Sequence, residues 1–278
     1  MNCFSKYKWL VLIAFVSFIC FWILFGKDAE FRETSYPFEV VDNEIRIKET
    51  GDVLYRFIPV DGGDMSFDYS DTMTVIDKKE VFINAYKKHI NSFLIGETPV
   101  TKRLWYLVMN DIDINEKENS LYKYFTIYED SVNEEGWKAF VEKLGKLTGR
   151  EFRIPNSNEW EYAARGGLLG KKYKYSGSDS IDEVAYYKNN ALPEIFSFLG
   201  MQKKPNELGL YDMSGGVWEL TTTKFSDVNR LVTPHISQSS LFEMSISRGG
   251  NHDSPAEDCT VQSMGCKFKT GLRLILNY

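Results

Sequence analysis

The feature that most constrains the fold of this chain is the segment Asn206–Leu220, which reads NELGLYDMSGGVWEL. It combines a turn signal, two adjacent glycines, carboxylates on both sides of them and a tryptophan. Packing alone does not require so many special residues, and the glycine pair indicates an ordered turn. Two further blocks, Phe152–Gly167 and Ser247–Gly250, have the same character. The sequence therefore predicts a domain organised around ordered loops.

The composition is that of a folded domain. Of the 278 residues, 43% are hydrophobic and 15% are aromatic, which suffices for a packed core and argues against disorder. The net charge is −6 and no basic stripe is visible, so nucleic acid is not an expected partner. The aromatic residues suit either a carbohydrate- or peptide-binding surface or a core poor in regular structure, and we favour the core. No repeat or linker interrupts residues 53–278, which indicates one domain.

The N-terminal region contains an apolar run. Lys6 and Lys8 precede Trp9–Phe25, seventeen uncharged residues that approach the minimum needed to span a bilayer. A cleaved signal peptide is the alternative. Cleavage at Ala29 would need a small residue two positions earlier, and Lys27 stands there. We expect an uncleaved signal anchor with its N-terminus in the cytoplasm. The expected divisions are a cytoplasmic N-terminus (1–8), a transmembrane anchor (9–25), a stalk with a first strand (26–52) and the domain (53–278).

Periodicity and capping signals predict a few regular elements. Thr101 begins one expected helix, and apolar spacing between 137 and 147 predicts a second, with Ser131 and Glu134 as its capping box. Asn156 and Glu159 predict another capping box. Short strands are expected over 57–63, 80–86 and 92–95. Beyond residue 167 the chain has almost no long periodic segment, and a bound calcium ion is a natural means of holding such loops.

Several motifs occur together and in a fixed order: Gly96–Thr101 with Trp105, Arg153–Gly167, Asn206–Asp212, Gly215–Glu219, Arg248–Gly250 and Gly271–Leu274. In this the chain resembles the formylglycine-generating enzyme family, the sulfatase-modifying-factor domains. The resemblance implies a C-type-lectin-related fold, a single loop-rich α+β domain with two main helices and short antiparallel sheets. Together with the anchor, it implies a bacterial envelope protein that crosses the cytoplasmic (inner) membrane once. The domain would lie in the periplasm or outside the cell.

A calcium site is expected at the glycine turn. Calcium binds six to eight oxygen ligands, and Asp212 and Glu219 flank a turn that can direct the carbonyls of Gly215 and Val217 inward. The alternative is that Asp212 caps a turn and Glu219 is a surface acid. The resemblance implies calcium at these positions. It also implies a second site that uses Asn190, although the other half of that site has no clear counterpart in this sequence.

The expected copper site departs from the family pattern. The resemblance implies an oxidase that binds copper(I) through two thiolates, four and nine residues after Gly250. Those positions hold Ser254 and Cys259, and a serine hydroxyl cannot replace a thiolate for copper(I). Cys266 is the only other thiol that could complete a pair in the domain. Cys259 and Cys266 could equally form a disulfide, and the sequence leaves both states open.

Two functions follow from these observations. The first is a non-catalytic module that binds an envelope protein or glycan, and the second is an oxidase that uses Cys259 and Cys266 with copper. For the module we expect a binding groove formed by the following residues: Asn251, His252, Ser254, Trp218 and Arg273. The first function is favoured because the thiolate pair is incomplete, and a fold does not by itself carry an activity.

Overall fold

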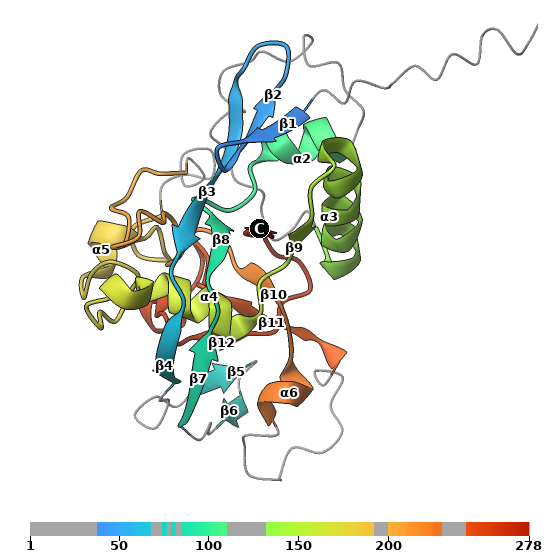
Figure 1. The fold of residues 1–278 in the computed structure, drawn as a ribbon. Coiled ribbons are helices and arrows are strands. Elements are labelled where there is room, and N and C mark those ends of the chain that lie inside the picture. Colours follow the sequence, from blue (N-terminus) through green and yellow to red (C-terminus); the bar gives the residue numbers. More distant parts are fainter. Residues whose placement is uncertain are drawn as a thin grey trace, which may run out of the picture. The chain divides into compact units, whose positions relative to one another are not determined.

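The computed structural model describes residues 38–67, 74–76, 79–81, 85–109, 132–191, 200–229 and 243–277, with backbone alone for 74–76, 79–81 and 228–229. Phe38–Tyr278 form one compact unit (Figure 1). The predicted anchor, Trp9–Phe25, lies outside the described residues. Within the described ranges, no helix combines the length and the apolar character that a membrane crossing needs.

The largest sheet has six strands in the order β1-β2-β3-β8-β13-β9, and every neighbouring pair is antiparallel. The strands are Phe38–Val41 (β1), Glu44–Ile47 (β2), Val53–Val60 (β3), Phe93–Gly96 (β8), Phe152–Arg153 (β9) and Ile275–Leu276 (β13). The region 26–52, for which a stalk with a first strand was expected, contains two strands, β1 and β2, and β2 pairs with β3. The C-terminal strand β13 lies between β8 and β9, so the two ends of the domain share one sheet.

Three smaller antiparallel sheets complete the strand structure. They comprise β4 (Gly63–Phe67) with β7 (Tyr86–Ile90), β5 (Thr74–Ile76) with β6 (Lys79–Val81), and β10 (Glu219–Lys224), β11 (Ser245–Arg248) and β12 (Met264–Gly265) in that order. The single strand predicted over 80–86 overlaps both β6 and β7. Strands β10 and β11 carry two of the motif blocks into the interior.

The helices are short apart from one. They are α2 (Lys102–Met109), α3 (Glu134–Thr148), α4 (Ser157–Ala164), α5 (Ile181–Val184) and α6 (Phe225–Asn229), with 3-10 turns at η3 (Gly167–Leu169) and η5 (Ala256–Cys259). The capping box of Asn156 and Glu159 forms as predicted at the start of α4. Asn133 caps α3, and Ser131 lies outside the described residues. The predicted α+β class with short antiparallel sheets is confirmed.

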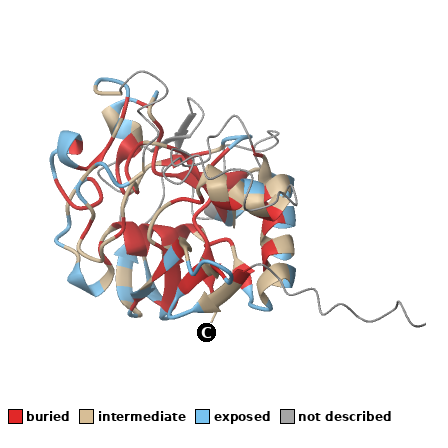
Figure 2. Cartoon of the chain, turned by 90° about the horizontal axis from the view of Figure 1, so that it is seen from above, coloured by how far each residue is buried: buried red, intermediate tan, exposed pale blue. Residues whose placement is uncertain are grey.

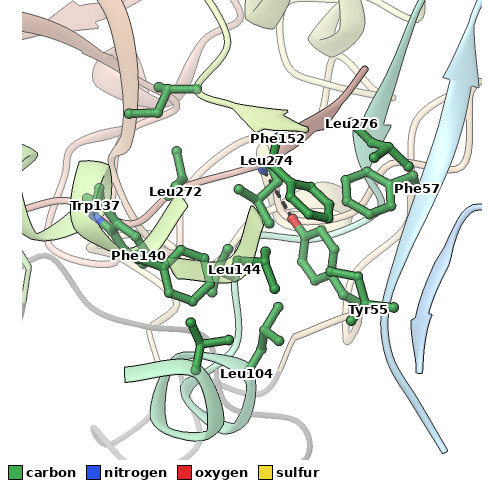
Figure 3. Close-up of a cluster of buried hydrophobic side chains, with 14 of the residues drawn as sticks. Tyr55, Phe57, Leu104, Trp137, Phe140, Leu144, Phe152, Leu272, Leu274 and Leu276 are labelled. Atoms are coloured by element: carbon green, nitrogen blue, oxygen red, sulfur yellow. Dashed lines mark hydrogen bonds between the residues drawn. The ribbon is translucent and has the colours of Figure 1, made fainter. Parts of the chain in front are cut away.

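One part of the core lies between the large sheet and helices α2 and α3 (Figure 3). Trp137 and Phe140 of α3 pack edge to face with ring centroids 5.6 Å apart, and the Trp137 indole N–H donates to the Thr270 carbonyl at 2.9 Å. The Tyr55 hydroxyl donates to the Thr98 carbonyl at 2.6 Å. A second cluster, centred on Trp160 of α4, includes residues of β8, β11 and β13. Buried residues accordingly gather along the interior strands (Figure 2).

Glu134 links α3 to the small sheet. Its carboxylate accepts hydrogen bonds from Lys224 Nζ at 2.9 and 3.0 Å and from Ser245 Oγ at 2.8 Å, and it pairs with Lys138 at 2.8 Å. Burial alone would raise the pKa of Glu134. The hydrogen bonds from Lys138, Lys224 and Ser245 outweigh that effect and lower the pKa to about 2.

This lowered pKa predicts a loss of stability in acid. The contribution of Glu134 is present above its unfolded pKa, near the ordinary value of 4.5, and disappears as the pH falls towards 2. We expect Glu134→Gln to cost about 1–2 kcal/mol at pH 7 and much less near pH 2, after allowance for solvent screening. Urea unfolding across this range measures the difference. An equal effect of the substitution at both pH values would contradict the prediction.

Candidate functional site

The centre of the motif region is a buried ion pair between Glu219 and Arg273. Arg273 Nη2 lies 2.8 Å from Glu219 Oε1 and Arg273 Nε lies 3.0 Å from Oε2, and both side chains are fully buried. The Trp160 indole N–H also donates to Glu219 Oε2, at 2.7 Å. The remaining guanidinium N–H groups donate to the carbonyls of Gly96, Glu97 and Tyr211. Arg273 thus joins β8, β10 and the C-terminal segment.

A second buried ion pair, between Arg248 and Glu161, also lies near Trp160. Arg248 Nη2 donates to Glu161, and both side chains are fully buried. Arg248 also donates to the carbonyls of Gln262 and Ser263, and its guanidinium lies 5.5 Å from the centre of the Trp160 ring. Glu161 has another partner in Arg165, at 2.8 Å.

These two pairs involve four of the ten charged residues in the motifs. A buried charge is very costly unless it is paired and hydrogen-bonded, and each of these guanidiniums is. The glutamate of the Gly-Gly-Val-Trp-Glu motif pairs with the arginine of Gly-Leu-Arg, and the second glutamate of Glu-Trp-Glu pairs with the arginine of Arg-Gly-Gly. The motifs that relate this chain to its family therefore define the scaffold, and they leave its chemistry to other residues.

The glycine turns bring these segments together. Gly215 has a φ of 70°, and a side chain there would collide with the Tyr186 carbonyl. Gly250 has a φ of 74°, and a side chain there would overlap the Cys259 sulfur and the Asp258 carbonyl. Both positions need glycine for conformation and for space.

Asp212 and Glu219, the predicted calcium residues that flank the glycine turn, are close enough for their charges to interact. Asp212, with a φ of 58°, accepts a hydrogen bond from Met201 N–H at 2.9 Å. Burial raises the pKa of Asp212, and the Met201 hydrogen bond and the charge of Arg273 offset this only in part. Glu219 already accepts three hydrogen bonds, so at most about one lone-pair direction remains for a cation.

The chemistry of this turn fits a calcium ion. Asp212, Glu219 and Arg273 together carry one net negative charge, and the desolvated Asp212 carboxylate would gain from a cation. No backbone N–H of the described residues donates to the carbonyl oxygens of Gly215 and Val217. The ligands would be mainly neutral oxygens, since no group of three or more His, Cys, Asp or Glu side chains suited to a metal occurs in the described ranges.

Asn190, predicted for a second calcium site, makes local contacts. Its side-chain oxygen accepts from Tyr187 N–H at 2.9 Å, and its amide nitrogen donates to Asp182 at 2.9 Å and to the Ala185 carbonyl at 3.0 Å. The segment 192–200, in which the sequence shows no clear counterpart of the other half of this site, lies almost entirely outside the described residues. The second site stays a prediction.

Ser254 stands at the position of the first family cysteine, and its hydroxyl group is engaged in hydrogen bonds. Ser254 Oγ donates to Asn251 Oδ1 at 2.6 Å and accepts from Asn251 N–H at 3.0 Å, and both residues are buried. This local ring satisfies the serine hydroxyl without any metal. Ser254 is consequently a structural residue of the turn in this arrangement.

Cys259 is a buried thiol. Its exposed fraction is 0%, and it packs with Tyr175, Val184 and Tyr187 in a small hydrophobic cluster. Burial raises the pKa of Cys259 to about 12, and the nearby Asp258 carboxylate adds to this effect. Cys266 is partly buried and packs against a different cluster, around Trp160, and the two cysteines form no disulfide with each other. This donor set does not fit copper(I), which requires thiolates that converge on one point.

The burial of Cys259 predicts that it resists thiol reagents. With a pKa of about 12 instead of the ordinary 9.0, its thiolate fraction near neutral pH falls about a thousandfold. We expect Cys259 in the native protein to react with an alkylating reagent at least about a hundredfold more slowly than in urea. Mass spectrometry of the peptide that contains it measures the rate. Comparable rates in the two states would show an accessible thiolate.

The predicted groove residues differ in accessibility. Trp218 and Arg273 are buried in the interior, and Asn251 and Ser254 are buried in their turn. His252 is partly exposed, and its ring nitrogens lie 3.4 Å from the Gly216 carbonyl and 3.4 Å from Asp253. The exposed part of this region is formed instead by the loop after β12, where Lys267 lies over the Trp218 ring and Phe268 is 70% exposed.

The sequence motifs did not single out Glu161 and Arg248 as a pair. A usable signal was present, because Glu161 stands directly between Trp160 and Tyr162 and is followed by two alanines, and Arg248 is followed by two glycines. Charged residues in such segments are almost never fully buried unless they are paired. Which acid meets which arginine depends on the topology.

Comparison with known proteins agrees with this fold and these motifs. A family model described as the sulfatase-modifying factor enzyme 1-like domain matches residues 47–273. The match spans most of the chain, so this chain belongs to the sulfatase-modifying factor enzyme 1-like domain family.

Relatives of named function match parts of the chain. The chaperone protein LppX of Paenibacillus barcinonensis is 33% identical over 142 residues, which is 44% of this chain and 51% of LppX. The formylglycine-generating enzyme of Mycobacterium tuberculosis is 31% identical over 125 residues, which is 38% of this chain and 42% of that enzyme. The chain thus spans about half the length of the curated relatives it matches.

A solved structure shares the fold over a longer range. Treponema denticola variable protein 1 superimposes with a TM-score of 0.62 at 20% identity, and the match covers 81% of this chain and 95% of that protein. At this level of identity the likeness concerns the fold alone.

Proposed function

We propose that this chain is a non-catalytic binding module on a C-type-lectin-related scaffold, which recognises a protein or glycan of the cell envelope. Its place would be the outer side of the cytoplasmic membrane of a bacterium, held there by the predicted anchor at 9–25. LppX, about half of whose length matches this chain, is named a chaperone protein, and that name supports a binding role.

The observation that supports this proposal most is the state of the two family thiol positions. Ser254 is engaged with Asn251, and Cys259 is fully buried with its pKa raised to about 12. Metal binding by cysteine requires the thiolate, which this environment strongly disfavours. The scaffold pairs Glu219 with Arg273 and Glu161 with Arg248, and neither pair offers an open catalytic group.

The binding surface would include the exposed loop after β12. Phe268 projects into solvent with 70% of its surface exposed, and the exposed Lys267 lies 5.2 Å from the centre of the Trp218 ring. Aromatic residues, phenylalanine among them, are enriched at protein interfaces relative to the rest of the surface. The predicted groove residues Asn251 and Ser254 would shape the surface from beneath.

A photo-crosslinking amino acid at position 268 tests this proposal. In cell envelopes it should form a discrete adduct with a protein or glycan, because the side chain is exposed and central to the proposed surface. The matched control is the same amino acid at position 106, since Tyr106 is also exposed but lies on α2. Adducts of equal yield at both positions, or none at 268, would count against the proposed surface.

The alternative is an oxidase of cysteine in sulfatase-type substrates, with Cys259 and Cys266 as copper ligands. The identity to the Mycobacterium tuberculosis formylglycine-generating enzyme favours it. It would require Cys259 to leave its cluster with Tyr175 and Tyr187, and Cys266 to leave the one around Trp160. The proposal for a binding module needs no such rearrangement.

Calcium is a further part of the proposal, with Asp212, Gly215, Val217 and Glu219 as ligands. We expect calcium to raise the melting temperature, because the ion binds only the folded turn. Asp212→Asn removes one charge while keeping an oxygen and tolerating the positive φ, and should weaken calcium binding about tenfold. Thermal unfolding in calcium and in EDTA measures this. Identical unfolding curves of the unsubstituted protein in calcium and in EDTA would contradict a calcium site.

A further inference from the structure

The turn η3 displays two neighbouring leucines on the surface. Leu168 is 63% exposed and Leu169 is 62% exposed, more than any other large aliphatic side chain in the described residues. Single exposed apolar residues are ordinary, but two adjacent ones on a projecting turn form a small apolar surface. Neither leucine belongs to the buried clusters of the domain.

The backbone holds the leucines in this position. Gly166 and Gly167 have φ values of 88° and 55°, and Leu169 N–H donates to the Gly166 carbonyl at 3.0 Å. Gly170 packs so closely on the Arg165 carbonyl that a side chain would not fit there. Leu168 lies against Gly63 of β4 on its inner side. The turn is therefore a defined projection.

Two basic residues follow the leucines after Gly170. Lys171 and Lys172 are both exposed, and Glu207, which lies beside Gly166, is an acidic neighbour of the turn. Exposed leucines next to lysines are typical of segments that lie in a membrane interface, where the apolar side chains enter the headgroup boundary and the lysines meet anionic lipids. We propose that the segment 167–172 is a contact surface for an anionic lipid bilayer.

The predicted anchor would allow even a weak contact between segment 167–172 and the bilayer to form. Residues 26–37, twelve in number, separate the predicted span from β1, and they can extend at most about 40 Å. Such a short connection gives a high effective concentration of the bilayer at the domain surface. The contact would orient the domain and leave the loop at Phe268 for another partner. Its failure would leave the proposed binding function untouched.

Hydroxyl-radical footprinting of the full chain tests this inference. The protein is reconstituted into vesicles of phosphatidylcholine alone or with added phosphatidylglycerol, and the oxidation of Leu168 and Leu169 is measured by mass spectrometry. We expect at least about fivefold slower oxidation when phosphatidylglycerol is present, because the leucines enter the interface. Equal rates in the two kinds of vesicle would overturn the proposal.

Two charge-matched variants provide the control. Lys171→Glu with Lys172→Glu should abolish the protection, whereas Lys48→Glu with Lys188→Glu changes the net charge equally at exposed sites elsewhere and should retain it. Loss of protection in both variants would make the effect one of net charge and would overturn the local contact. Protection in detergent without lipid would show that a second copy of the chain covers the leucines, which also contradicts the proposal.

Discussion

Arg273→Met is expected to lower the free energy of unfolding by about 3–5 kcal/mol, because it leaves Glu219 buried without its cation. The guanidinium makes two hydrogen bonds to Glu219 and three to backbone carbonyls, and the side chain has no exposed surface. Urea unfolding monitored by circular dichroism measures the change. The exposed Arg150→Met is the matched control and should change stability by less than about 0.5 kcal/mol.

A double-substitution cycle separates the ion pair from the packing. Glu219→Leu alone should cost about as much as Arg273→Met, since it leaves the arginine buried and unpaired. The double variant should be at least about 2 kcal/mol more stable than the sum predicts, because neither charge remains. It should still be less stable than the original protein, since the carbonyls of Gly96, Glu97 and Tyr211 lose a donor. Strict additivity would mean that the two residues do not interact.

The second large effect is expected at Trp160, which lies between the two buried ion pairs. Trp160→Ala should cost about 3–5 kcal/mol, because it opens a cavity in the cluster and removes the indole donor to Glu219. The ring also contacts Arg248, so both pairs lose a neighbour. Thermal or urea unfolding measures the loss.

Trp160→Phe isolates the hydrogen bond from the packing. It keeps most of the ring volume and should cost about 1–2 kcal/mol, mainly because Glu219 Oε2 loses one of its two hydrogen bonds and keeps only that from Arg273 Nε. Equal losses for the alanine and phenylalanine variants would mean that the cavity contributes little. A loss below about 1 kcal/mol for Trp160→Ala would contradict the central position of this residue.

Local elements of the fold could be predicted from the sequence. The capping box of Asn156 and Glu159 and the helix end at Gly149 depend on residues within a few positions of one another. The same holds for the glycine turn at 215–216, whose positive φ values follow from the residue type. The N-cap of α3 differs from the prediction: Asn133, which is closer to the first turn, caps the helix in place of Ser131.

The non-local part of the site could not be predicted in this way. Glu219 and Arg273 are 54 residues apart, and the sequence assigned one to calcium and the other to a groove. They meet because β10 and the segment before β13 converge at Gly271, which the order of residues does not reveal. For the same reason the sequence predicts one strand within 26–52 where the structure has two, since β1 joins the sheet only by pairing with β2.

The family motifs therefore carry less information about activity than about folding. Their arginines and glutamates neutralise one another in the interior, and their glycines allow close approach of loops. A chain can keep all of these features while Ser254 replaces the first cysteine and Cys259 is buried, without losing its fold. The function of this protein therefore has to be inferred from its surface residues and its cysteines.

The most direct test of this account is turnover of a Cys-x-Pro-x-Arg peptide by the full chain, supplied with copper(I) in air and followed by mass spectrometry. The account predicts no conversion of the peptide cysteine to formylglycine, because Cys259 is buried and protonated and Ser254 is no thiolate donor. Conversion that disappears in the Cys259→Ala variant would contradict it and establish Cys259 as a catalytic ligand.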